Sequence, residues 1–586
     1  MIRKLLIANR GEIAVRIMRT AKELGIETVT VYSEVDRDAR HVHSADEAYL
    51  LGPAAPAQSY LNAPRLLEIA DRSGADAVHP GYGFFAENAG FAQAVIDAGL
   101  TWIGPHPGAI AAMGEKVRAR QTMIAAGVPV VPGGAQPLRS VAEAVRAAHE
   151  YGLPLALKAS SGGGGKGLKV ARTLEAVEEA YTTAAREAQA YFKDPTVYAE
   201  RYLDNPKHIE LQILADRHGT VLHAGERDCS LQRRHQKLWE EAPSAIAPAV
   251  VAALRTTGIA AARAIAYDSI GTIEFLVSDD AVYFLEMNTR IQVEHTVSEM
   301  VCGLDLVREQ IRVASGEPLG YEQAQIDLRG HAIEVRVNAE DPARGFLPVP
   351  GTIRTYEEPG GPGVRVDSAA RAGWTIPPDY DSLIAKLVVW APDRAQALAR
   401  LRRAIDEFVV TGVPTTLPIA RALIDHPPVA QSTYGTATLE RFAHTFVAAP
   451  TEQPAQAVQP ATSAGEGEVV RIEVNDRLYV VRLLDAPAQR GTLPPAPRSA
   501  PRRGEPPSTG TSKETNTNQI RSPMHGVVVE LAVAVGSTVD QGQVVAVIEA
   551  MKMMNEIRAP RAGVVAGVHT AAGATVEPQA VLLTFA

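Results

Sequence analysis

Cysteine and long apolar runs are scarce in this sequence of 586 residues, and each scarcity excludes a class of protein. Two cysteines, Cys229 and Cys302, are too few for a disulfide scaffold or a four-cysteine zinc site. No run of about 18 apolar residues exists, so no transmembrane helix and no membrane partner are expected. The apolar run Leu5–Ala8 is too short for a secretory signal. We therefore expect a cytoplasmic protein.

Positive charge is also in the minority, because 58 Lys and Arg face 67 Asp and Glu, for a net charge of −9. A general nucleic-acid binder is usually basic, so no nucleic-acid partner is expected. Apolar residues at 46% and charged residues at 21% are typical of globular proteins and exclude a chain disordered throughout. At about 100–200 residues per domain, the length predicts three to five domains.

The start of the chain predicts a strand, a helix and a second strand. The strands are the apolar run Lys4–Ala8 and the segment Thr28–Tyr32. Between them, Gly25 ends a helix whose apolar stripe has spacings of four, four and three residues: Ile13, Ile17, Ala21 and Leu24. This βαβ unit predicts that a parallel sheet opens the protein.

A proline-rich segment separates the last part of the chain from the rest. Seven of the 35 residues from Asp485 to Gln519 are proline, which predicts an extended, partly stiff linker. Just upstream, Val470, Ile472 and Val474 alternate with polar residues before Asn475, which predicts a β-hairpin over residues 469–484. An isolated hairpin is only marginally stable in water, so we expect it to dock on a partner or another domain.

The tail, residues 520–586, contains an internal repeat with an offset of 37 residues. The matching pairs are Ser522–Val528 with Ala559–Val565, and Gly536–Val539 with Gly573–Val576. Two copies of one unit predict a small β-sandwich with pseudo-twofold symmetry. Lys552 lies between the copies and is predicted at a hairpin tip. A solvated turn lysine is the alternative, but the flanking methionines would be unusual at an exposed tip.

A glycine-rich loop, Lys158–Gly167, follows the apolar segment Leu155–Leu157. Consecutive glycines let backbone N–H groups approach phosphate oxygens, and Lys158 and Lys166 would neutralise phosphate charge. The loop is not a P-loop, because no Ser or Thr follows its Gly-Lys pair. A flexible hairpin loop is the alternative interpretation.

Polar and apolar residues alternate from residue 286 to residue 294. In an extended chain, five polar side chains about 6.6–6.8 Å apart would share one face: Glu286, Asn288, Arg290, Gln292 and Glu294. Upstream, Glu274 interrupts an apolar strand. Carboxylate and amide oxygens suit Mg²⁺, so Glu274, Glu286 and Asn288 are candidate metal ligands. An ordinary amphipathic strand is the alternative.

Together these residues resemble the biotin-dependent carboxylases. The resemblance is carried by Ile7–Ala14, His79–Gly83, the glycine-rich loop, Glu226–Lys237, Glu286–His295 and Ala550–Met553. It implies an α/β protein in which residues 1–446 form an ATP-grasp biotin carboxylase. The implied parts are an N-terminal parallel α/β domain (1–115), an ATP-grasp domain (116–330), a C-terminal α+β domain (331–446), a linker with the hairpin (447–519) and a biotinyl β-sandwich (520–586).

The resemblance also implies roles for individual residues. Biotin would be attached to Lys552, and Glu274, Glu286 and Asn288 would hold Mg²⁺ or Mn²⁺. The implied ATP-binding residues are Lys116, Lys158, Gly163, Gly164, Gly165, Lys166, Glu200, Arg201, Tyr202, Leu203, His208, Gln232 and His235. The implied bicarbonate-binding residues are Lys237, Arg290, Gln292 and Val293. Glu294 would be the base that deprotonates bicarbonate, and Arg336 would stabilise the enolate-like form of biotin.

The implied activity is that of a ligase, which activates bicarbonate with ATP as carboxyphosphate and carboxylates biotin. The 73 residues between 446 and 520 leave no room for a carboxyltransferase domain. This implies an α subunit of acetyl- or propionyl-CoA carboxylase with a separate carboxyltransferase β subunit; an α subunit of methylcrotonyl-CoA or another acyl-CoA carboxylase is the alternative. Biotin protein ligase and a carboxylase homodimer or larger hetero-oligomer are further implied partners. A different ATP-grasp ligase and a non-catalytic carrier are the rival interpretations.

Overall fold

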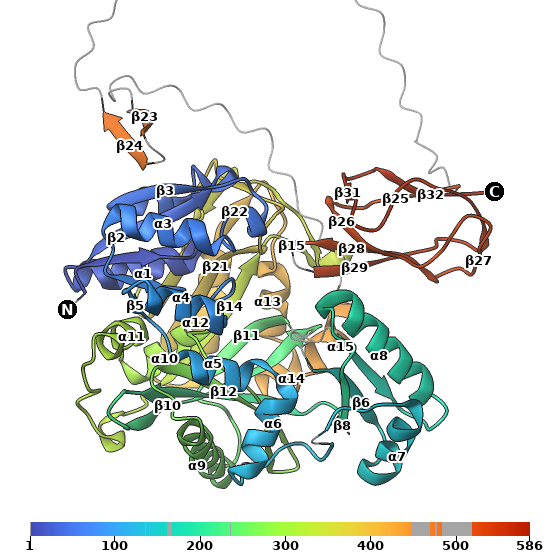
Figure 1. Cartoon of the computed structure of the whole chain (residues 1–586), viewed down its shortest axis with the longest axis horizontal. Coiled ribbons are helices and arrows are strands. Elements are labelled where there is room, and N and C mark those ends of the chain that lie inside the picture. The colour runs from blue at the N-terminus through green and yellow to red at the C-terminus, as the bar shows by residue number, and fades with distance from the viewer. Residues whose placement is uncertain are drawn as a thin grey trace, which may run out of the picture. The chain divides into compact units, whose positions relative to one another are not determined.

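The computed structural model describes residues 2–134, 136–160, 167–234, 236–446, 469–474, 477–482, 518–551 and 553–586. They belong to two compact units, the large unit (residues 1–450) and the small unit (residues 451–586), drawn in Figure 1. The predicted hairpin is confirmed as the antiparallel strands β23 (Val469–Val474) and β24 (Arg477–Arg482). Among the described residues, no helix is both long and apolar enough to cross a membrane.

The large unit opens with parallel strands in the order β3-β2-β1-β4-β5, and the predicted βαβ unit is confirmed. Gly25, at φ +72°, follows the first long helix and ends it as expected. The strands are β1 (Lys4–Ile7), β2 (Glu27–Ser33), β3 (Glu47–Gly52), β4 (Ala77–His79) and β5 (Thr101–Trp102). The helices are α1 (Gly11–Glu23), α2 (Arg40–Ser44), α3 (Ala63–Ser73), α4 (Ala89–Asp97), α5 (Pro107–Gly114) and α6 (Lys116–Ala125).

A three-stranded antiparallel sheet with the order β7-β6-β8 follows, covered by two helices. Its elements are α7 (Val141–Tyr151), β6 (Leu155–Ala159), β7 (Leu168–Ala171), α8 (Val177–Phe192) and β8 (Val197–Arg201). The predicted apolar strand before the glycine-rich loop is thus present as β6. Residues 161–166 of that loop lie outside the described residues.

An eight-stranded antiparallel sheet with the order β13-β12-β9-β10-β11-β14-β21-β19 forms the centre of the large unit. Its strands are β9 (Lys207–Ala215), β10 (Val221–Arg233), β11 (Gln236–Ala242), β12 (Ile270–Ser278), β13 (Ala281–Asn288), β14 (His331–Asn338), β19 (Val364–Ser368) and β21 (Leu383–Ala391). Because β11 pairs with β14, one sheet runs across the domain boundary predicted at residue 330.

Helices and short strands surround this central sheet. The helices are α9 (Pro248–Ala264), α10 (His295–Cys302), α11 (Leu306–Ala314), α12 (Arg394–Glu407), α13 (Leu417–Leu423), α14 (Pro427–Ala430) and α15 (Thr438–Thr445). The short strands are β15 (Glu340–Asp341), β16 (Leu347–Pro348), β17 (Gly351–Thr352), β18 (Thr355–Glu357), β20 (Thr375–Ile376) and β22 (Val409–Thr411).

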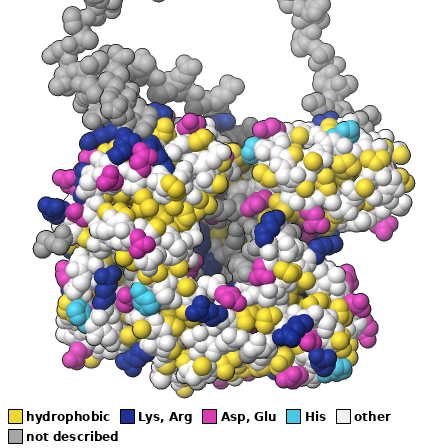
Figure 2. Space-filling view, in the orientation of Figure 1, with side chains coloured by type: hydrophobic (Ala, Val, Ile, Leu, Met, Phe, Trp, Pro, Cys, Tyr) yellow, Lys and Arg dark blue, Asp and Glu magenta, His cyan; other side chains and the backbone are white. Residues whose placement is uncertain are grey.

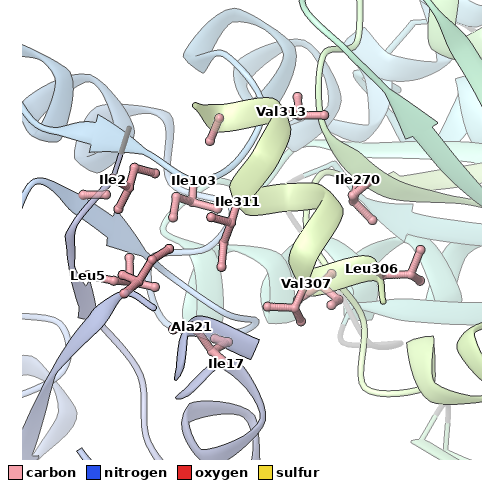
Figure 3. Packing of buried hydrophobic residues seen from close by; sticks show 14 of the residues in the cluster. Ile2, Leu5, Ile17, Ala21, Ile103, Ile270, Leu306, Val307, Ile311 and Val313 are labelled. Atoms are coloured by element: carbon pink, nitrogen blue, oxygen red, sulfur yellow. The ribbon is translucent and has the colours of Figure 1, made fainter. Parts of the chain in front are cut away.

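Helix α11 joins the parallel sheet to the central sheet, as Figure 3 shows. Its Val307 and Ile311 belong to one buried apolar cluster with Leu5 and Ile17 of the parallel-sheet layer and Ile270 of the central sheet. Burying a side chain of this size contributes about 1.5–3 kcal/mol. The cluster therefore fixes the two sheets relative to each other.

The small unit is a sandwich of two four-stranded sheets with the orders β25-β32-β30-β27 and β29-β28-β26-β31. Its strands are β25 (Gln519–Arg521), β26 (Gly526–Leu531), β27 (Thr538–Val539), β28 (Val544–Ala550), β29 (Met553–Arg558), β30 (Gly563–Val568), β31 (Thr575–Val576) and β32 (Val581–Phe585). The pairing of Gly526 with Val576 recurs 37 residues away as the pairing of Gly563 with Val539. The predicted pseudo-twofold symmetry is therefore confirmed.

A two-residue turn links β28 to β29, because Ala550 pairs with Met553. Lys552, the predicted biotin attachment residue, lies in this turn but outside the described residues. Met551 has a φ of +48°, and its side chain is 5% exposed. Met551 is therefore buried, although it lies next to the predicted hairpin tip.

Candidate active site

A cavity of about 700 Å³ lies in the large unit against β8 and the strands of the central sheet. Figure 2 shows a hollow in this face of the unit. The cavity is lined by all the predicted large-unit site residues that the structure describes: Lys116, Lys158, Glu200, Arg201, Tyr202, Leu203, His208, Gln232, Lys237, Glu274, Glu286, Asn288, Arg290, Gln292, Val293, Glu294 and Arg336. The predicted residues Gly163, Gly164, Gly165, Lys166 and His235 lie outside the described residues.

Lys237 is the central cation of the cavity. Its Nζ donates to a carboxylate oxygen of Glu210, to Glu274 Oε1 at 3.2 Å and to Glu294 Oε1 at 2.7 Å. Burial by itself would lower the pKa of this ammonium group, but the surrounding carboxylates outweigh burial and raise its pKa well above the usual value. Lys237 therefore stays charged at neutral pH.

Glu294 lies between two cations. One carboxylate oxygen accepts from Lys237, and the other accepts from Arg336 Nη2 at 2.9 Å. Burial favours the neutral carboxyl, but Lys237 and Arg336 more than compensate and keep the pKa of Glu294 below its ordinary value. Glu294 is thus an ionised, 2% exposed carboxylate that can accept a proton.

The direct partners of Arg290 are residues other than Glu294, although the charges of Arg290 and Glu294 attract each other. Arg290 donates to Asn288 Oδ1 at 2.6 Å and pairs with Glu87 Oε2 at 3.0 Å. Lys237 and Arg336, which come from strands distant in sequence, are the cations that donate hydrogen bonds directly to Glu294.

The extended face predicted from residue 286 to residue 294 is wrong beyond Asn288. Strand β13 ends at that residue, and residues 289–294 form a turn that leads into α10. The turn forms because the Gln292 and Glu294 carbonyls accept the backbone N–H groups of His295 and Val297, each at 3.3 Å. This turn, rather than a strand, carries Glu294 into the cavity.

Glu274 and Glu286 face each other in register on β12 and β13, and Asn288 lies two residues further along β13. Lys116 Nζ lies 3.2 Å from Glu286 Oε2 and, against the effect of burial, lowers the pKa of Glu286 to about 2. Asn288 Nδ2 donates to Glu274 Oε1 at 2.7 Å, while Asn288 Oδ1 accepts from Arg290 Nη2 at 2.6 Å. These charged and neutral oxygens fit a hard divalent cation such as Mg²⁺.

The other end of the cavity combines charge with apolar surface. Lys158 donates to Glu200, whose second oxygen lies 3.3 Å from Arg120 Nη1. Leu276 and Leu285 line the same cavity. The sequence analysis missed several lining residues here, around the start of α15: Thr436, Ala437, Glu440 and Arg441. Polar groups beside an apolar wall suit a nucleotide.

The sequence analysis also gave no role to Glu210 and Arg227, which organise the site from behind. Arg227 is fully buried and donates twice to Glu210 Oε2, at 3.0 and 2.9 Å, and once to Gln292 Oε1, at 2.6 Å. Gln292 in turn donates to Glu274 Oε1 at 2.7 Å. A charged residue in a buried strand needs a charged or polar partner. The acidic and basic residues within these mostly apolar strands were therefore the sequence signal that could have revealed the pair.

Strand β11 has an irregular register at Leu238, where the pairing with β10 skips one residue. Such a bulge changes which side chains face the site. It lets Lys237 and Glu240 contact the same cluster, since Glu240 Oε1 accepts from Arg336 Nε at 2.7 Å. Leu238 and Trp239 lie at this bulge, and both side chains are buried.

Four family descriptions match consecutive parts of the chain. Residues 1–110 match "Biotin carboxylase, N-terminal domain", residues 115–322 match "Carbamoyl-phosphate synthase L chain, ATP binding domain", and residues 334–441 match "Biotin carboxylase C-terminal domain". Residues 518–585 match "Biotin-requiring enzyme". Together they cover both units.

Individual relatives agree with these matches. A biotin-dependent acyl-coenzyme A carboxylase alpha3 subunit from Mycobacterium leprae is 46% identical over 94% of this chain and 93% of its own length. Biotin carboxylase 1 from Bacillus subtilis is 50% identical over 75% of this chain and 99% of its own length. The biotin carboxylase domain of the Hydrogenobacter thermophilus 2-oxoglutarate carboxylase, solved with MgADP, ADP and bicarbonate, aligns with a TM-score of 0.74 at 48% identity, covering 77% of this chain and 99% of that domain.

The fold, the charged cavity and the symmetric sandwich thus agree with these relatives over nearly the whole chain. The chain is a biotin carboxylase, an ATP-dependent ligase joined to a biotinyl domain, and it belongs to the family of biotin-dependent acyl-coenzyme A carboxylase alpha subunits.

Proposed function

We propose that this chain carboxylates biotin attached to Lys552, using ATP and bicarbonate, and passes the carboxyl group to a separate carboxyltransferase β subunit that acts on acetyl-CoA or propionyl-CoA. The observation that carries the proposal is Glu294, an ionised carboxylate between Lys237 and Arg336 next to the oxygen cluster of Glu274, Glu286 and Asn288. A cytoplasmic location, favoured by the low cysteine content, belongs to the same proposal.

The first step uses Glu294 as a base. Bicarbonate binds against Lys237, Arg290 and the Gln292–Val293 segment, which line the cavity around Glu294. Glu294 takes the bicarbonate proton, and a carbonate oxygen then forms a bond to the γ-phosphorus of ATP while the bond to ADP breaks. The product is carboxyphosphate. General-base catalysis of this kind contributes about 10²–10⁴-fold.

Charge on the transferred phosphoryl group is balanced by Lys116 and Lys158, which line the nucleotide end of the cavity. Glu274, Glu286 and Asn288 would hold Mg²⁺, which supplies positive charge to the phosphate oxygens when bound. Lys116 Nζ lies 3.2 Å from Glu286 Oε2, so this lysine is close to both the phosphate end of the cavity and a proposed metal ligand.

Carboxyphosphate then breaks its C–O bond to give CO₂ and phosphate; the phosphate takes the proton of the biotin ureido N–H, and the ureido nitrogen forms a bond to the carbon of CO₂. Arg336 supports this step because its guanidinium faces the cavity and carries a positive charge that can stabilise a negative ureido oxygen. Glu240 and Glu294 fix the guanidinium from two sides. The second half of the reaction belongs to the β subunit.

The test uses the purified full-length chain and its co-purified β subunit. We expect ATP hydrolysis that depends on bicarbonate, carboxylation of free biotin, and, with the β subunit, carboxylation of acetyl-CoA or propionyl-CoA in a panel of acyl-CoA substrates. ATP hydrolysis without any response to bicarbonate would refute the carboxylase mechanism. A preference for methylcrotonyl-CoA would instead favour the alternative acyl-CoA carboxylase.

A further inference from the structure

Lys386 of β21 is a fully buried cation that no step above uses. Its Nζ donates to the backbone carbonyl of Val293 at 2.8 Å and lies 3.2 Å from Glu12 Oε2 and 3.9 Å from Asp367 Oδ2. Lysine is almost never fully buried without partners. Here the partners come from α1, from β19 and from the turn at residues 289–294, so one ammonium group joins three separate parts of the large unit.

Val293 directly precedes Glu294 in the turn between β13 and α10. Because this turn is not part of a strand, it lacks the ladder of hydrogen bonds that fixes Glu274 and Glu286. Its position depends on individual contacts, and the bond from Lys386 to the Val293 carbonyl is one of them.

The placement of Lys386 relative to Arg336 gives this bond its significance. The two residues are direct cross-strand neighbours on β21 and β14. Arg336 binds the Glu294 carboxylate at 2.9 Å, and Lys386 binds the Val293 carbonyl at 2.8 Å. Two adjacent cations of one rigid sheet therefore hold two consecutive residues of the turn, one by its side chain and one by its backbone.

The charges around Lys386 are arranged to hold it in place. Glu12 lies on one side and accepts a hydrogen bond from the Tyr82 hydroxyl. Asp367 is the in-register neighbour of Lys386 on β19, and Arg365 Nη2 donates to its Oδ2 at 2.7 Å. These carboxylates restrict the ammonium group, and its third contact is the Val293 carbonyl.

We infer that Lys386 is a positioning residue for biotin carboxylation: it fixes the Val293 carbonyl and so places the Glu294 carboxylate between Lys237 and Arg336. The inference rests on the proposed role of Glu294 as the base. A misplacement of about 1 Å in a catalytic group can cost on the order of 10²-fold in rate. Losing this contact should therefore affect turnover more than ATP binding.

The experiment measures carboxylation of free biotin by the full-length chain carrying Lys386→Met, Glu294→Gln, or both. We expect Lys386→Met to lower kcat by roughly 10–100-fold, with the Kd of ATP changed less than about two-fold. In the Glu294→Gln background the same change should have little further effect, because Lys386 acts through Glu294. Lys4→Met, which removes a mostly buried lysine of the parallel sheet 2.8 Å from Glu47, should leave kcat unchanged, because the site lies on the central sheet.

Each outcome decides a separate question. An equal loss from Lys386→Met in both backgrounds, or no loss at all, would overturn the inference while leaving the base in place. Full activity of Glu294→Gln alone would refute the proposed base, and the inference with it. If Lys386→Met does not fold, Lys386→Gln takes its place, because an amide can be buried with hydrogen bonds but is too short to keep the Val293 carbonyl in position. The same loss and the same cancellation are expected for that variant.

Discussion

The large and small units differ in the polar groups that they bury: among the described residues, charged side chains are buried in the large unit, and only uncharged ones in the small unit. In the large unit, carboxylates such as Glu210, Glu240 and Glu294 are buried around the cavity and contact Lys or Arg. In the small unit, the buried polar side chains among the described residues are Ser522 and Asn555. The large unit is thus organised by charge balance and the small unit by a repeated strand register. Removing a buried charge should therefore be more costly in the large unit, and disturbing strand packing should be more costly in the small unit.

The largest effect should come from the small unit, at Lys552. Lys552→Arg keeps the charge but offers no amine for acylation. We expect the biotin mass increment to vanish and acyl-CoA carboxylation with the β subunit to fall to background, while the large unit carboxylates free biotin normally. Intact-mass spectrometry checks the first result. Biotin found on a different lysine would contradict the assignment.

Glu294→Gln should have the opposite pattern: loss of carboxylation with intact biotin attachment. Carboxylation of free biotin should fall by about 10²–10⁴-fold because the base is lost, whereas biotinylation of Lys552 should be unchanged. Steady-state kinetics and ATP titration separate the two functions of the cavity. If the variant fails to bind ATP, Glu294 has a structural role rather than the role of a base.

The stability of the large unit should depend on acid pH through Glu241, a buried carboxylate of that unit. Burial opposes ionisation, but hydrogen bonds from His331 Nε2 at 2.7 Å and Arg394 Nε at 2.8 Å lower its pKa to about 2 from an ordinary value of 4.5. The resulting stabilisation, about 3 kcal/mol, is present above pH 4.5 and is lost progressively as the pH falls towards 2. Glu241→Gln should remove this pH dependence.

Differential scanning calorimetry of the full chain at pH 7 and at a series of pH values from 5 down to 2.5 measures the effect, because the stabilisation is lost below pH 4.5. The transition of the large unit should shift less with pH in Glu241→Gln than in the wild type, and the transition of the small unit should not respond to the substitution. Identical pH dependence of the large unit in both proteins would show that Glu241 is not a depressed carboxylate.

The predicted linker, residues 485–519, precedes the sandwich, and shortening it tests whether the carboxylase and the sandwich depend on each other. Deleting about twenty residues removes roughly 60 Å of reach at ~3.1 Å per residue. We expect bicarbonate-dependent ATP hydrolysis with free biotin to be unchanged, and overall acyl-CoA carboxylation to fall about ten-fold or more because delivery fails. An unchanged overall rate would make the linker a passive spacer.

The smallest effect tests the symmetry of the small unit at two equivalent glycines. A Cβ at Gly526 would lie 2.5 Å from the backbone oxygen of Glu549, whereas one at Gly563 would meet the flexible Arg561 side chain and Phe585. Gly526→Ala should therefore destabilise the small unit by about 1 kcal/mol more than Gly563→Ala. Calorimetry of the full chain measures the difference, and equal losses would show that the two copies tolerate a methyl group alike.

Local patterns in the sequence predicted the elements whose contacts are close in the chain. The βαβ unit, the hairpin at residues 469–484 and the 37-residue repeat all follow from periodicity and spacing, and all are present. The residues that line the cavity were named from a family resemblance, and the structure brings the described ones together.

Contacts between distant strands could not be predicted in this way. Pattern alone extended β13 to Glu294, because alternation cannot reveal that backbone groups of α10 end the strand at Asn288. The cations that hold Glu294 come from β11 and β14, and the lysine behind Val293 comes from β21, about ninety residues later in the chain. Only strand order and register place these groups side by side.

The pseudo-twofold axis of the small unit also determines where its two ends lie. Gln519 pairs with Thr584, so the chain enters and leaves the sandwich side by side. The pseudo-twofold symmetry relates this pair of chain ends to the connection between β28 and β29. Figure 1 shows that connection at the end of the sandwich opposite the C-terminus. A rotation of the sandwich about its entry point near residue 518 would therefore move the end of the domain where β28 meets β29, next to the proposed attachment residue Lys552, further than any part near the chain ends.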